Sequence, residues 1–215
     1  MGGIFIERNN KIPILITLAI LFVAGVLGTA AYSLSNDIVI SLQLDGENVT
    51  VSSLAIPFGK NIREMEDEIL DYTTYEMNSV DSNITTLKSG ISEIARQHGF
   101  NNIIVDIESQ FGKDELPMIV VVDGTSMFPT LENGEKVIIL KTKNIQVGDI
   151  VVAKDPEYKL LIKRVGKISG DKVFLSADNN NTETFFHGGT YYQLISVEKW
   201  TNASNIVGVA KIFNV

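Results

Sequence analysis

The stretch that decides the fold is residues 118–131, MIVVVDGTSMFPTL. Its apolar first half predicts a buried strand, and Gly124 and Ser126 lie in the tight turn that follows. A second apolar run, residues 160–162, ends at Lys163. A serine hydroxyl is a useful nucleophile only when a neighbouring base removes its proton. Ser126 and Lys163 are therefore the candidate pair for nucleophilic chemistry.

Composition narrows the choice of base. The 215-residue chain has no cysteine and two histidines. His98 stands at a predicted helix end and His187 in a Gly-rich loop, so both are interpreted as surface or turn residues. Lysine acts as a base only after losing its proton, and burial among apolar groups lowers the pKa of the ammonium. Lys163 either projects from a buried strand or is an exposed residue at a strand end.

The surroundings of both residues predict a β-rich domain. From Pro117 onward, short apolar runs alternate with Gly, Asp and Asn turns, and no stretch has a helical period. This pattern favours a mainly β domain with coiled β-sheets over residues 116–215. The expected strands are 118–122, 136–140, 149–153, 160–165, 172–176 and 207–212.

Residues 35–115 predict a small α/β accessory region. Residues 37–54 have the alternation of two strands around a turn, and residues 102–107 resemble a third strand. Apolar residues over 59–98 recur at helical spacing with one shift of phase, which predicts two helices or one stuttered helix. We interpret this region as helix packed on its own sheet, with a docking surface or a coiled coil as the alternative.

The N-terminal segment has the features of a membrane anchor. Residues 12–34 contain no charge, and a span needs roughly 20 apolar residues. Arg8 and Lys11 precede this segment, and the first charges after it are acidic. The positive-inside rule then predicts a cytoplasmic tail at 1–11 and an extracytoplasmic remainder, on a single-pass protein of the cell membrane. A cleaved signal peptide is the alternative, because small residues occupy 28–31.

Charge and composition exclude some partners. The net charge of −8 argues against nucleic-acid binding, which requires a basic face. The absence of cysteine excludes disulfides, and we expect neither a metal nor a cofactor. Four triplets fit the N-glycosylation pattern, at Asn48, Asn83, Asn180 and Asn202.

The order of several short blocks resembles that of type I signal peptidases, which are membrane-anchored Ser/Lys proteases. The resemblance covers about residues 117–212 and implies signal-peptide-bearing precursors and the lipid bilayer as partners. Lys163 stands where the form in eukaryotic secretory membranes has histidine, so the chain resembles the lysine form. The lysine and the insert at 35–115 together indicate a prokaryotic protein, with an archaeal source as one alternative. The blocks are 126–131, Gly134-Glu135, 148–152, 162–165, Gly170-Asp171 and 178–180.

The resemblance implies a role for each matching residue. Ser126 would be the nucleophile, its backbone N–H would help to hold the oxyanion, and Lys163 would be the general base. Asp178 would support the site by pairing with Arg164. Many relatives have a serine at the position of Gly124, whose hydroxyl helps to bind the oxyanion.

A second departure concerns the block around Asp178. Ala177 replaces the glycine of the family's Gly-Asp-Asn, and the Ser and Asp that often follow are not cleanly present. We leave open which of Thr182, Glu183 and Thr184 substitutes for them. The aromatic residues of the domain are interpreted as core or, alternatively, as contacts with lipid. They are Phe128, Phe185, Phe186, Tyr191, Tyr192 and Trp200.

Two other functions remain open from the sequence. One is a related Ser/Lys protease with a narrower processing role, in which residues 35–115 select the substrate. The other is a catalytically inactive, anchored binding module that keeps the fold.

The predicted topology can be tested by proteolysis. Protease added outside spheroplasts should digest the chain beyond residue 34 and spare the tail at 1–11, because the tail is expected in the cytoplasm. Immunoblotting with tags at the two ends measures this. A digested tail would reverse the orientation, and a mature chain beginning near Ala31 would identify a signal peptide.

Overall fold

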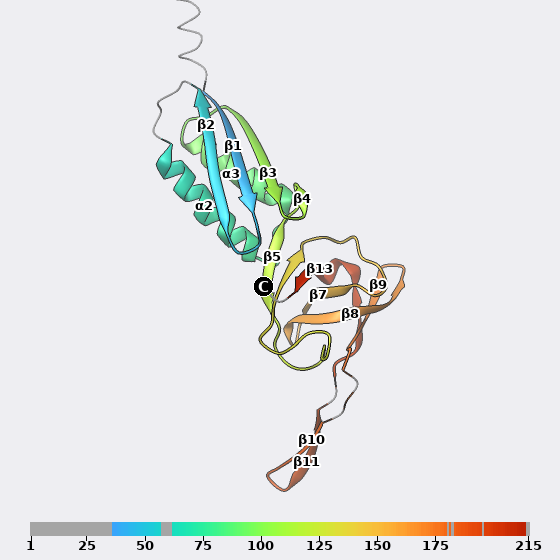
Figure 1. Cartoon of the computed structure of the whole chain (residues 1–215). Coiled ribbons are helices and arrows are strands. Elements are labelled where there is room, and N and C mark those ends of the chain that lie inside the picture. The colour runs from blue at the N-terminus through green and yellow to red at the C-terminus, as the bar shows by residue number, and fades with distance from the viewer. Residues whose placement is uncertain (1–35, 57–61, 180, 182, 195, 214–215) are drawn as a thin grey trace, which may run out of the picture.

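The described residues form two connected parts, an α/β part and a β part (Figure 1). The predicted tail at 1–11 and anchor at 12–34 lie outside the described residues. Within the described residues, no helix is both long and apolar enough to cross a membrane. The computed structural model describes residues 36–56, 62–179, 181, 183–194 and 196–213.

The α/β part is a four-stranded sheet covered on one face by two helices (Figure 1). Alternate residues of its first strand, among them Ile38 and Ile40, are buried beneath the helices. The first and third strands run parallel, as a crossover through helices requires. In the order β2-β1-β3-β4, the elements are β1 (Asp37–Leu44), β2 (Val49–Ile56), β3 (Asn102–Ser109) and β4 (Gly112–Lys113), with α2 (Arg63–Asn78) and α3 (Ile84–Gln97).

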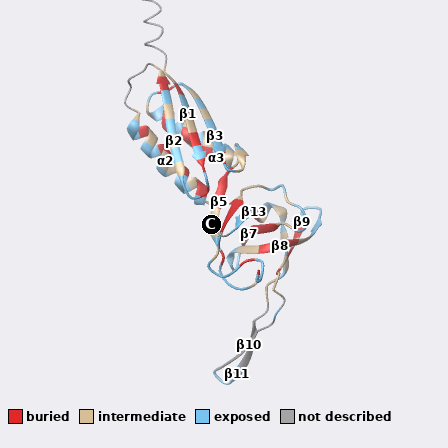
Figure 2. Cartoon of the chain, in the orientation of Figure 1, coloured by how far each residue is buried: buried red, intermediate tan, exposed pale blue. Residues whose placement is uncertain are grey.

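The helical region is two helices, which decides between the two alternatives left by the sequence. Ser79 adopts an extended conformation and ends α2. Asn83 then begins α3, because its side chain accepts hydrogen bonds from the N–H groups of Thr85 and Thr86. Thr86 Oγ1 accepts in return from Asn83 N–H, which completes a capping box. The buried faces of both helices lie against the sheet (Figure 2).

The β part is built on a seven-stranded antiparallel sheet with the order β12-β9-β8-β7-β13-β6-β5. The six strands expected from the sequence are present, with ends that differ by up to four residues, so the expectation of a mainly β part is confirmed. The strands are β5 (Pro117–Val121), β6 (Lys136–Leu140), β7 (Ile150–Asp155), β8 (Lys159–Ser169), β9 (Lys172–Ser176), β12 (Lys199–Asn202) and β13 (Ile206–Phe213), with a short 3-10 helix, η1 (Ala203–Asn205).

A separate hairpin, β10 (Glu183–His187) with β11 (Thr190–Leu194), projects from the β part on the side away from the α/β part (Figure 1). The interpretation of His187 as a loop residue is wrong, because it ends β10 and pairs with Thr190. Gly188 and Gly189 both have positive φ, as a two-residue hairpin turn requires.

Gly208 tests the packing of the central sheet. A Cβ atom at this position of β13 would lie 2.3 Å from the carbonyl oxygen of Leu140, a backbone atom that cannot rotate away. Gly208→Ala should therefore reduce the free energy of unfolding by about 1–3 kcal/mol. Thermal unfolding measures the loss, with Lys211→Ala, an exposed position on the same strand, as the control. Equal melting temperatures for the two variants would contradict this close approach.

Candidate functional site

The site is formed where two strands of the β part bring together residues distant in sequence. β5 leads into the turn that contains Ser126, and Lys163 lies within β8. Lys163 Nζ donates a hydrogen bond to Ser126 Oγ. The structure thus brings together the two residues that the sequence selected as nucleophile and base.

Lys163 is almost completely enclosed, with 3% of its surface exposed. On β8 it pairs across the sheet with Val151, and its neighbour on the same face, Val165, is fully buried. Burial lowers the pKa of Lys163, while the carboxylates of Glu198 and Asp178 act in the opposite direction. The side chain of Lys163 therefore projects inward from a buried strand. The alternative, an exposed lysine at a strand end, is wrong.

The turn of Ser126 is held by the segment that follows β9. The N–H groups of Asp178 and Asn179 donate to the carbonyl oxygen of Ser126, at 3.1 and 3.0 Å. Asn179 Nδ2 also donates to the carbonyl oxygen of Thr125 at 3.0 Å. Among the described residues, the N–H of Ser126 has no acceptor, so it is free to donate to a ligand.

Asp178 and Arg164 form a bidentate ion pair beside the two reactive groups. Arg164 Nε lies 2.7 Å from Asp178 Oδ1, and the second bond joins Nη2 to Oδ2 at 2.5 Å. Arg164 Nη1 also donates to the carbonyl oxygen of Gly148. The guanidinium of Arg164 lowers the pKa of Asp178, and the partial burial of Asp178 opposes this. The pair fixes the 178–179 segment that holds Ser126.

The backbone conformation at position 124 explains why glycine stands there in place of the serine that the family resemblance implies. Its φ is +95°, a region that residues with a side chain rarely adopt. Its N–H donates to Asn133 Oδ1 at 2.7 Å, so the turn is held by a side chain from the far end of the same β5–β6 connection. The conformation favours glycine, and the serine hydroxyl common in relatives is absent at this position.

Two residues near Lys163 were not among the site residues predicted from the sequence. Ser196 lines the cleft and donates through Oγ to the carbonyl oxygen of Asn179 at 2.9 Å. Glu198 accepts a hydrogen bond from Ala177 N–H and is the carboxylate with the largest electrostatic effect on Lys163. Both follow the β10–β11 hairpin, which separates them from Asp178 in sequence. The turn signal at 188–189 between two aromatic pairs was the clue to that insertion.

Other predicted residues lie outside the site or outside the description. Thr182 is not among the described residues, and the side chains of Glu183 and Thr184 are not described either. His98 ends α3 in the α/β part, where its Nε2 lies 3.0 Å from Glu68 Oε2. Within the described residues, no cluster of His, Cys, Asp and Glu has the form of a metal site.

A cleft of about 490 Å³ opens in front of Ser126 and Lys163. One wall is the end of β5 with the turn after it, and the opposite wall is the first half of β8. Exposed apolar side chains line it, including Val121, Tyr158 and Leu160. The Ser126 hydroxyl, a buried amine and a free N–H therefore lie beside one partly apolar cleft.

Comparison with known proteins gives one family. The sequence model of the family described as Peptidase S24-like matches residues 83–190. The matched segment begins at the N-cap of α3 and contains Ser126, Lys163 and Asp178. Among curated proteins, none matches the chain.

The Arg164–Asp178 pair predicts an acid-sensitive contribution to stability. Asp178→Ala should lower the free energy of unfolding at pH 7 by about 1–3 kcal/mol, because it removes hydrogen bonds to a charged group. The native pKa of Asp178 is lowered, so this contribution is present above the unfolded value of about 3.9 and is lost as pH falls through the native value.

Denaturant unfolding at pH 7 and near pH 2.5 measures both effects. The difference between wild type and Asp178→Ala should shrink at the lower pH. Asp171→Ala, an exposed position in the loop before β9, is the control. A difference that does not change with pH would assign the stability to packing and not to the ion pair.

Proposed function

Because the chain belongs to the Peptidase S24-like family, we propose that its serine peptidase domain is a membrane-bound endopeptidase that removes signal peptides from exported proteins. The observation that carries the chemistry is the contact of the buried Lys163 amine with Ser126 Oγ. The choice of signal peptides is supported by the motif blocks of type I signal peptidases and by the uncharged segment 12–34. Its place is the cell membrane, with the catalytic part outside.

The proposed reaction begins with neutral Lys163. As Ser126 Oγ attacks the scissile carbonyl carbon, Nζ accepts the hydroxyl proton, and the Ser126 N–H donates to the oxyanion. The resulting ammonium gives its proton to the leaving amine, and the peptide bond breaks. Lys163 then takes a proton from a water molecule as the water oxygen attacks the acyl carbon, and it returns that proton to Ser126 Oγ as the ester bond breaks and the acyl product leaves.

The cleft supports binding of an extended peptide. β5 is an edge strand of the sheet, and its end forms a wall of the cleft together with β8. An added strand would form main-chain hydrogen bonds along such an edge while alternate side chains entered the groove. Val121 is 63% exposed beside Ser126, which favours an apolar segment over a charged one. The resemblance implies small residues before the cleaved bond.

A narrower processing role is the second candidate. The α/β part and the β10–β11 hairpin are not explained by the motif blocks of signal peptidases. Either element would suit selection of one class of exported protein. An inactive binding module is disfavoured, because a lysine with no catalytic use gains little from burial beside a serine hydroxyl.

Precursor cleavage by the full chain in membranes tests the proposal. Ser126→Ala and Lys163→Ala should each reduce cleavage by at least about 10³-fold, since nucleophile and base act as a unit. Lys163→Arg should be equally inactive, because guanidinium keeps its proton. The matched controls are Ser169→Ala and Lys167→Ala, at exposed positions on β8, the strand that contains Lys163.

The wild-type rate should rise with pH until Lys163 is fully deprotonated, at a pH below the ordinary lysine value because burial lowers its pKa. A Lys163→Arg variant that cleaves would identify a different base. A protein that cleaves short peptides but no signal-peptide precursor would favour the narrower role.

A further inference from the structure

The catalytic cleft continues into a second hollow, which lies between the two parts of the molecule. Val121 lines both, because it ends β5 at the point where the chain enters the cleft. The second hollow has a volume of about 210 Å³. One of its walls is the C-terminal end of α2, with Thr74 and Asn78, and the opposite wall is β5, with Ile119 and Val121.

A third, more open hollow extends along α2. Thr74 and Asn78 line it as they line the second hollow, and Asp71 and Tyr75 lie further along it. The four residues have the spacing i, i+3, i+4 and i+7, so they share one face of the helix, and all four are exposed. Together, the second and third hollows form the α2 groove, which continues the catalytic cleft onto the α/β part.

The backbone of β5 leaves hydrogen-bonding groups along this path. Val122 N–H donates to the carbonyl oxygen of Glu135, on the side of β6. Successive residues of an antiparallel strand direct their backbone groups to opposite sides, so those of Ile119 and Val121 point away from β6. β5 is the edge of the sheet on that side. An extended peptide that pairs with Ile119 and Val121 can therefore leave the cleft alongside the α2 groove.

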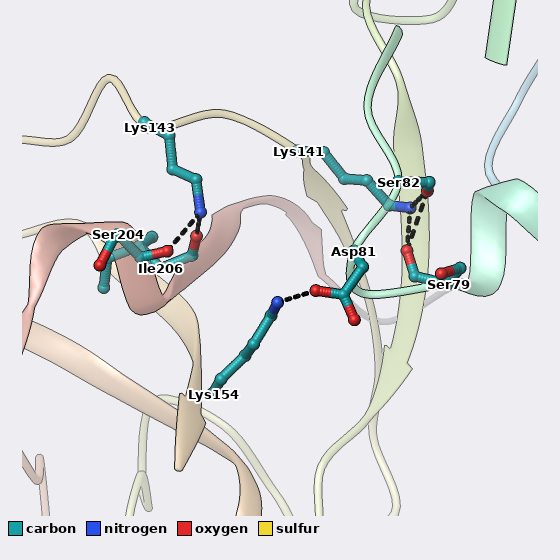
Figure 3. Close-up of polar contacts among 8 residues, drawn as sticks. All are labelled: Ser79, Asp81, Ser82, Lys141, Lys143, Lys154, Ser204 and Ile206. Atoms are coloured by element: carbon teal, nitrogen blue, oxygen red, sulfur yellow. Dashed lines mark hydrogen bonds and ion pairs between the residues drawn. The ribbon is translucent and has the colours of Figure 1, made fainter. Parts of the chain in front are cut away.

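Polar contacts fix α2 beside β5. Lys141, just after β6, donates to the carbonyl oxygens of Glu76 and Ser79 at the end of α2, at 2.8 and 2.6 Å (Figure 3). Lys154 of β7 forms an ion pair with Asp81, in the loop that follows α2 (Figure 3). Because the α/β part is held to the β part at this end of the helix, the groove is formed before any peptide binds.

The charges along the groove indicate which peptides it suits. Glu47 and Lys136 line the second hollow and form an ion pair at 3.0 Å, so their charges offset each other. Asp71 is the other charged residue among the described residues that line the groove. The groove therefore suits an uncharged or basic segment and disfavours an acidic one.

We propose that the α2 groove is an extension of the substrate site, which binds an uncharged or basic segment of an extended peptide at a distance from the cleaved bond. This inference rests on the proposed function for the ligand being a substrate. A strand advances about 3.3 Å per residue, so a peptide that follows the five residues of β5 must extend roughly five residues from the cleaved bond to occupy the groove.

Binding to the full chain with Ser126→Ala tests the inference without cleavage. The probes are two fluorescent peptides from the cleavage region of a signal-peptide precursor, one with about three residues on each side of the bond and one with about ten. Thr74→Trp, which fills the groove where its two hollows meet, should weaken binding of the long peptide about 10-fold and leave the short peptide unaffected.

Ser89→Trp is the matched control, because Ser89 is an exposed residue of α3 that lines neither hollow. It should bind both peptides as the parent protein does. A long peptide that binds no more tightly than the short one, or equally to the two tryptophan variants, would overturn the inference. A Thr74→Trp variant that changes only the oligomeric state would assign the groove to contact between copies and would overturn it too.

Charge exchange in the long peptide tests the chemistry of the bound segment. A peptide with lysines beyond the fifth residue from the bond should bind about 3-fold more tightly than one with glutamates there, and Asp71→Lys should reverse the order. An order that is the same in both proteins would contradict the assigned preference.

Cleavage with Ser126 intact separates this inference from the proposed function. In Thr74→Trp, kcat/KM for the long peptide should fall about 10-fold, mainly through KM, and that for the short peptide should not change. A protein that binds the long peptide through the groove but cleaves neither peptide would contradict the proposed function and support the groove. Cleavage of the long peptide with equal kcat/KM in Thr74→Trp and Ser89→Trp would reject the groove alone.

Discussion

The exclusion of water from Lys163 is the constraint on which the catalytic half of the molecule depends. An ammonium buried without a full set of partners is costly, so the enclosed group is driven toward the neutral amine. Strand alternation separates this group from its neighbour, because Lys163 faces the core while Arg164 reaches the carboxylate of Asp178. One strand thus presents a buried amine with a lowered pKa and a permanent cation at consecutive positions.

Much of the fold could be predicted because its signals are local. Apolar alternation identified β1, and a phase shift near Ser79 identified the break between two helices. The pairing of β5 with β6 and of β7 with β8 then follows from short connections between neighbouring runs. The contact of Ser126 with Lys163 needed more than local pattern, and the order of the motif blocks supplied it.

The remainder depends on contacts between residues far apart in sequence. Ser196 and Glu198 reach the site only because the β10–β11 hairpin begins and ends there, so inspection of positions 182–184 could not find them. The packing of Val80 against the core of the β part could not be predicted from periodicity. A single apolar residue in a polar loop gives no indication of its partner. The contact between the α/β part and the β part at Gly46 also leaves no pattern in the sequence. There the side chain of Ile138 fills the space that a Cβ atom of residue 46 would take.

The position of β13 has a consequence for the order of assembly. This strand follows all the other described strands in sequence, yet it lies between β7 and β6 in the middle of the sheet. Without it, the sheet is two fragments, with the Ser126 turn attached to β5–β6 and Lys163 on β7–β8. These two fragments share no strand until β13 pairs with β6 on one side and with β7 on the other. The Ser126–Lys163 contact therefore depends on a strand that contains neither residue, so docking of β13 is the step that couples closure of the sheet to assembly of the site.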